Sequence, residues 1–77
     1  MSAEFNEVVI HLNEAVDEDM LGDIEQDIRT DPGVISVGHR PRQQHLMVVV
    51  YDTAVARGAS ILRHFSARGL HAQLVGM

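Results

Sequence analysis

The side chains in this sequence that could do chemistry are its histidines and a group of carboxylates near residue 17. The histidines number five, at His11, His39, His45, His64 and His71. The carboxylates are Glu14, Asp17, Glu18 and Asp19. Imidazole nitrogens and carboxylate oxygens are good ligands for borderline divalent ions such as Zn(II), Ni(II), Co(II) and Cu(II). A metal site made of these two residue types is therefore one function that the sequence permits.

The residue types that are missing exclude several other chemistries. The chain has no cysteine and no lysine, and all six basic residues are arginine. Disulfides, iron–sulfur clusters, thiolate zinc sites and lysine nucleophiles are therefore excluded. The sequence contains no glycine-rich phosphate loop and no recognisable spacing of a serine, a histidine and an acid. We expect a protein that is not an enzyme.

Length and composition are those of a small globular domain. At 77 residues and 45% hydrophobic, the chain should fold as one domain, residues 1–77. The net charge of −5 argues against a nucleic-acid partner. No apolar run approaches the roughly 20 residues of a membrane span, so we expect no membrane insertion. The N-terminal residues lack the basic region of a signal peptide, so we expect a cytoplasmic location.

Hydrophobic periodicity divides the chain into six elements. Strands are predicted at about 6–12, 34–39, 45–51 and 70–75, and helices at about 17–30 and 57–68. Asp17 is the expected N-cap of the first helix, and Gly69 is a suitable stop for the second. The polar residues 40–44 should form the turn of a hairpin.

This order of elements, βαββαβ, predicts an α/β fold of the ferredoxin-like type. Right-handed crossovers give an antiparallel four-stranded sheet with strand order 4-1-3-2 and two helices on one face. The other face of the sheet would then be open.

Several short motifs resemble the heavy-metal-associated domain family of small copper-chaperone-like proteins. They are Pro32-Gly33-Val34 with Ser36-Val37, then Tyr51-Asp52, then Gly69 with Ala72 and Leu74-Val75. The resemblance covers nearly the whole chain and implies the same ferredoxin-like fold. The family carries M-x-C-x-x-C between its first strand and first helix, and this motif binds Cu(I).

In this sequence the resemblance places Ala15 at the methionine position, and Asp17 and Met20 at the two cysteine positions. We therefore expect no Cu(I) binding in the family's manner, because that site needs two thiolates. Asp17 and Met20 stay candidate metal ligands through a carboxylate and a thioether. The alternative is that Asp17 caps the helix and Met20 packs at the edge of the core.

The alternation of the first and last strands adds two candidate ligands, His11 and His71. Both side chains should point to the open face, and because the two strands are adjacent they could be cross-strand neighbours. In this topology we expect all five histidines in the half of the molecule that holds the carboxylates Glu14, Asp17, Glu18 and Asp19. The candidate divalent metal site is His11, His71, Asp17 and Met20.

The third predicted strand is apolar on both faces, which indicates a covered sheet. The family resemblance implies that Met47, Val49 and Tyr51 are buried. Leu46, Val48 and Val50 should then face outward, with Val9 and Val75 beside them. A contiguous apolar patch is typical of a contact surface. The cover would be a partner protein or a second copy in a homodimer.

Three functions follow as hypotheses. The first is a non-enzymatic protein-interaction or regulatory module that lacks any cofactor. The alternative is a metal-handling protein that binds a divalent transition metal through histidine and carboxylate. A third is a small-molecule sensor with its ligand at a dimer interface.

Overall fold

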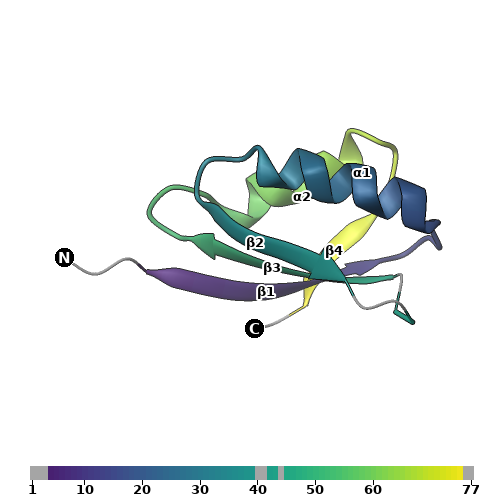
Figure 1. Cartoon of the computed structure of the whole chain (residues 1–77), viewed down its shortest axis with the longest axis horizontal. Helices are drawn as coiled ribbons and strands as arrows, with labels where there is room; N and C mark the ends of the chain where they lie inside the picture. The colour runs from purple at the N-terminus through teal and green to yellow at the C-terminus, as the bar shows by residue number, and fades with distance from the viewer. Residues whose placement is uncertain (1–3, 40–41, 44, 76–77) are drawn as a thin grey trace.

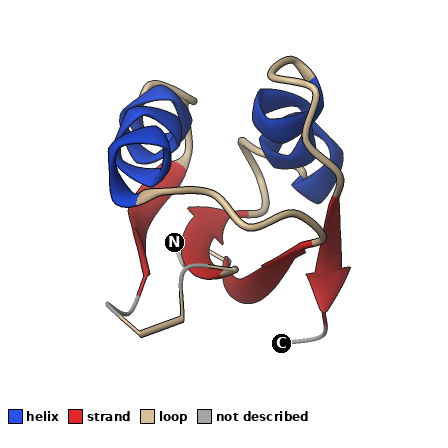
Figure 2. Ribbon diagram, turned by 90° about the vertical axis from the view of Figure 1, so that its right-hand side faces the viewer, coloured by secondary structure: helices blue, strands red, loops and turns tan. Residues whose placement is uncertain are grey.

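The computed structural model describes residues 4–39, 42–43 and 45–75. The elements run in the predicted order (Figure 1). They are β1 (Phe5–Leu12), α1 (Glu18–Arg29), β2 (Val34–His39), β3 (Leu46–Asp52), α2 (Gly58–Ser66) and β4 (Ala72–Val75). Both helices cover one face of the sheet and leave the other face bare (Figure 2). None of the helices in the described part of the chain is long and apolar enough to span a membrane.

The sheet has the order β2-β3-β1-β4, with every neighbouring pair antiparallel. This is the predicted order 4-1-3-2, so the ferredoxin-like fold is confirmed. The last strand begins later than predicted, at Ala72 instead of residue 70. The reason lies at the end of α2, where Gly69 has a φ of 77° and the N–H of Leu70 donates to the carbonyl of Phe65 at 3.0 Å. The backbone of Leu70 thus closes the helix end and does not extend β4.

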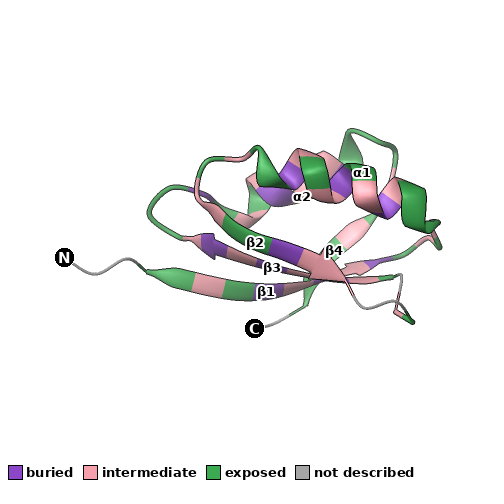
Figure 3. Ribbon diagram, in the orientation of Figure 1, coloured by how far each residue is buried: buried purple, intermediate pink, exposed green. Residues whose placement is uncertain are grey.

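The core lies between the helices and the sheet (Figure 3). Its strand residues alternate with outward-facing ones, as in Val8, Ile10 and Leu12 of β1. The helix residues follow a single stripe, and Leu21, Ile24 and Ile28 of α1 are fully buried. Ile61 and Phe65 of α2 are fully buried as well. Because the apolar periods of the sequence match this geometry, the helix-facing side of the sheet is fixed by the pattern.

The turn between α1 and β2 depends on Gly33. Its φ of 92° lies in the left-handed region, and a Cβ on it would approach the Cβ of Val55 to 2.8 Å. Its carbonyl accepts the N–H of Asp52 at 2.7 Å. Glycine is required here because both the backbone angle and the close approach exclude a side chain.

Candidate functional site

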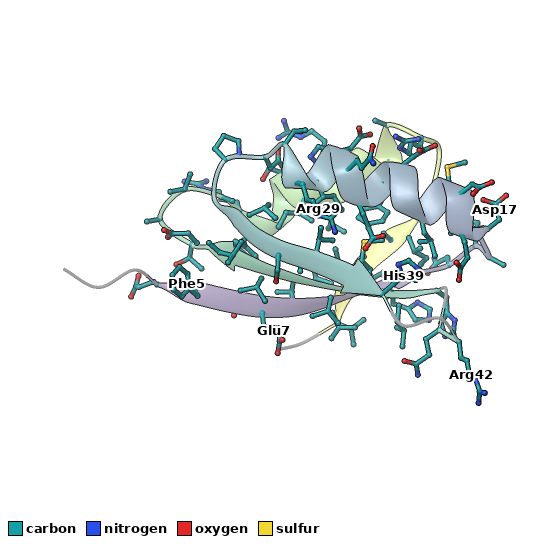
Figure 4. All side chains as sticks on the ribbon, viewed as in Figure 1. Phe5, Glu7, Asp17, Arg29, His39 and Arg42 are labelled. Atoms are coloured by element: carbon teal, nitrogen blue, oxygen red, sulfur yellow. The ribbon has the colours of Figure 1, made fainter. Side chains whose placement is uncertain are left out.

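The start of α1 is the first candidate site, because it contains Asp17 and Met20. Asp17 precedes the helix in extended backbone conformation, and its Oδ1 accepts the N–H of Met20 at 2.8 Å. This is the geometry of an N-cap, which satisfies a helix N–H that has no partner inside the helix. Glu18 and Asp19 follow in the first turn, where negative charge is favoured by the helix dipole. These carboxylates therefore have a structural role, because they stabilise the start of α1, where Asp17 lies (Figure 4).

Met20 lies beside a cation. The Nη1 of Arg68 is 3.8 Å from the sulfur of Met20. The Nη2 of the same arginine donates to the carboxylate of Asp27. The guanidinium group thus joins the chain segment after α2 to the side of α1. A metal ion held by the sulfur would be repelled by this positive charge.

His71 is held by Glu14. The backbone N–H of His71 donates to Oε1 of Glu14 at 2.9 Å, and the ring Nδ1 contacts Oε2. The pKa of Glu14 lies below its ordinary value. The main cause is the hydrogen bond with the ring of His71, and the second is the hydrogen bond from the backbone N–H of His71. Both bonds stabilise the ionised carboxylate. The sequence placed Glu14 near the site but did not pair it with His71.

His11 has different neighbours from those expected. Its cross-strand partner on β4 is Gln73, and not His71, which precedes that strand. The ring of His11 instead meets the ring of His45 edge to face, with centroids 5.5 Å apart. The four candidate ligands from the sequence are therefore distributed over separate contacts: His11 with His45, His71 with Glu14, Asp17 with the helix backbone, and Met20 with Arg68.

The remaining histidines also lie apart. His64 contacts Asp31 at 2.8 Å, at the opposite end of α1 from Asp17, so the expectation that all five histidines share one half of the molecule is wrong. His39 has its Nδ1 3.3 Å from a carboxylate oxygen of Glu25, an ion-pair separation without hydrogen-bond geometry. Within residues 4–39, 42–43 and 45–75, no three or more His, Asp or Glu side chains gather as a metal site.

The second candidate site is the open face of the sheet. The register brings Gly38 opposite Val48, Val48 opposite Val9, and Val9 opposite Val75. These four residues form one line across all four strands, which we call the apolar row. Leu46 and Val50 flank it on β3. The structure thus places the five residues of the predicted interaction face side by side, with Val75 50% exposed.

Gly38 borders a hollow of about 420 Å³ on the sheet face, which extends along the apolar row past Val48 to Val9. Its lining is Val9, Gly38, His39, Gln43, Leu46 and Val48. The sequence reasoning missed this feature, although a glycine inside a predicted strand is a recognised signal of a close approach.

Comparisons with known proteins support the fold. No family model matches the chain, and no curated protein matches its sequence. Solved structures do match over nearly the full length. Oxidized MerP from Ralstonia metallidurans CH34 has a TM-score of 0.82 at 14% identity, over 95% of this chain and 100% of that one. A copper-binding domain from HMA7, a P-type ATPase, has a TM-score of 0.79 at 14% identity, over 91% and 93%.

A copper form of CopA from Bacillus subtilis has a TM-score of 0.78 at 22% identity, over 100% of both chains. At such low identity these matches establish the fold and leave the ligands to be argued from this chain's own residues. The resemblance read from the sequence motifs is thereby confirmed for the fold: the chain has the ferredoxin-like structure that these proteins share, and its sequence has no cysteine.

Proposed function

We propose that this protein is a non-enzymatic contact module, with an interaction or regulatory role, whose working surface is the open face of the sheet. The observation that carries this proposal is the apolar row with its flanking Leu46 and Val50. An antiparallel sheet with one bare face normally presents polar residues there. Here all four strands contribute an apolar residue or a glycine to one line, which favours a surface that another polypeptide covers.

The start of α1 supports the same function because its residues do not suit a Cu(I) site. At the positions where similar domains carry thiolates, Asp17 serves as the helix cap and Met20 contacts the guanidinium of Arg68. A two-coordinate Cu(I) site requires soft ligands and no competing cation. Asp17 offers only a hard carboxylate, and the guanidinium of Arg68 lies beside the sulfur of Met20, so we infer that the fold serves a different use here.

A second candidate function is the handling of a borderline divalent metal at a site that includes His11 of the four ligands named from the sequence. The observation in its favour is the contact between His11 and His45, whose ring centroids are 5.5 Å apart. Two imidazoles that bind one tetrahedral ion at about 2.0 Å have centroids roughly 5 Å apart. This pair would need further ligands from elsewhere, so we place this function second.

The proposed function is tested by site-specific photo-crosslinking in the native host. A benzophenone amino acid replaces Val48 at the centre of the open face. The matched control carries the same amino acid at Gln26, an exposed residue of α1 in the helix layer. We expect a covalent protein adduct from position 48 and none from position 26. Equal adducts from both positions, or none from position 48, would contradict the proposal.

A further inference from the structure

No contact within residues 4–39, 42–43 and 45–75 requires a glycine at position 38. Gly38 lies within β2 at a position where its φ is not left-handed. A Cβ added to it would meet no atom of the described residues within 4 Å. Glycine weakens a strand because it loses more backbone entropy than other residues and offers no side chain to pack. In a strand it often marks a place where another molecule approaches closely.

The apolar row contains a feature that fits this unfilled position. Val75 stands at the other end of the row, on the opposite edge of the sheet, and is 50% exposed. Between the two ends lie Val48 and Val9, on the central strands. The row thus runs from the unfilled position at Gly38 to the exposed side chain of Val75, and both are on the same face.

A two-fold axis converts this arrangement into a self-complementary surface. If the axis runs parallel to the strands, between β3 and β1, it brings Gly38 of each copy over Val75 of the other. The same axis places Val48 over Val9. Resting on the proposed function, we propose that the partner on the open face is a second copy of this chain, and that Val75 of each copy occupies the unfilled position at Gly38 of its partner. An isologous contact of this kind closes on itself as a dimer.

Charge sets the border of the contact. Glu7 lies on β1 two residues before Val9 and extends away from the helices (Figure 4). Its exposed carboxylate limits the apolar surface on that side. On the other side the surface continues through Leu46 and His11, which are cross-strand neighbours. The same axis packs the ring of His11 against Leu46 of the second copy, so the contact centre lies between the row and the hairpin.

The size of the face predicts a reversible dimer. The contact spans four strands that are about 4.8 Å apart. Along each strand it covers three consecutive pairs of residues, of which one residue in each pair faces outward. These dimensions give a footprint of roughly 400 Å². A standard stable interface buries about 800 Å² on each partner, or about twice this. The two copies should therefore exchange between monomer and dimer and not form an obligate pair.

Cysteine cross-linking tests the predicted pairing, and the chain's lack of cysteine makes the background clean. Gly38→Cys and Val75→Cys are prepared as separate proteins, then oxidised alone and as a mixture. Within one copy these positions are three strand spacings, about 14 Å, apart, which is too far for a disulfide. We expect the mixture to yield a disulfide-linked heterodimer, and each single variant to stay largely unlinked. The control mixture of Gln26→Cys with Val75→Cys should not link.

Two outcomes would overturn the inference. One is preferential linkage of position 38 to 38 or of 75 to 75, which would indicate another symmetry. The other is no linkage together with a monomeric mass at about 1 mM, the range of very weak affinity. If the Val48 photo-adduct then has the mass of a different protein, the dimer is excluded while the contact function stands. If that adduct is absent as well, both fail.

Discussion

The backbone N–H of Met20 donates to Oδ1 of Asp17 across 2.8 Å. The resemblance read from the sequence places these two residues at the two cysteine positions of the heavy-metal-associated family, and here they form a helix cap. The cap stabilises the start of α1 in the absence of any metal.

The cap predicts the effect of replacing Asp17. Asp17→Ala should lower the free energy of unfolding by about 1 kcal/mol, because the N–H of Met20 loses its acceptor. Asp17→Ser keeps a capping oxygen and should retain most of the stability. Urea denaturation of the three proteins measures this. An Asp17→Ala variant with unchanged stability but altered metal affinity would instead support the ligand role.

Restoring thiolates tests whether the fold at this corner can still hold Cu(I). We expect the double variant Asp17→Cys/Met20→Cys to bind Cu(I), whereas the unaltered protein does not, because two thiolates supply the soft site. Adding Arg68→Ala should tighten binding further by removing the nearby positive charge. Competition with a Cu(I) chelator measures each affinity. Strong Cu(I) binding by the unaltered protein would contradict the account.

Two glycines should respond oppositely to the same substitution. Gly33→Ala should cost at least about 1 kcal/mol, because its φ is left-handed and its new Cβ would collide with Val55. Gly38→Ala should be neutral or stabilise the monomer by up to about 1 kcal/mol, because the space is open and the unfolded chain loses entropy. Thermal unfolding in dilute solution gives both values. A large loss at Gly38 would mean that it has a structural role within one copy.

The contact between Glu14 and His71 predicts an acid-side effect. The pKa of Glu14 is lowered by hydrogen bonds from the ring and backbone of His71. A depressed folded pKa contributes stability above the unfolded pKa of about 4.3, and the contribution is lost as the pH falls through the folded value. Carboxyl carbon NMR should show Glu14 titrating below an ordinary glutamate. In His71→Ala the midpoint should move upward, and an unmoved midpoint would contradict the assignment of the ring as the main cause.

Much of the fold could be predicted from the sequence because the apolar periods match the elements. The alternation in the first predicted strand, residues 6–12, indicated which of its residues face the helices. The neighbours of single residues were harder. The first and last strands pair His11 with Gln73, which is two residues from the expected partner, His71. A register shift of two residues keeps every side chain on its face of the sheet but changes each cross-strand neighbour. Val75 was therefore correctly placed on the open face, and the pairing of His11 with His71 was wrong.

The histidine contacts depend on tertiary distances that no sequence period encodes. His64 meets Asp31, and His71 meets Glu14, through side chains from different elements. Each pair joins residues more than 30 positions apart. A count of histidines could suggest a cluster, but the turns and the strand register decide which carboxylate each ring meets.

A dilution series followed by amide NMR tests the central claim most directly. Spectra are recorded from about 10 μM to about 1 mM, which spans weak and moderate affinities. The account predicts concentration-dependent shifts at Gly38, Val48 and Val75, with residues of the helix layer such as Gln26 unchanged. Spectra that do not change with concentration, with the tumbling time of a monomer throughout, would contradict the pairing of two copies through the open face.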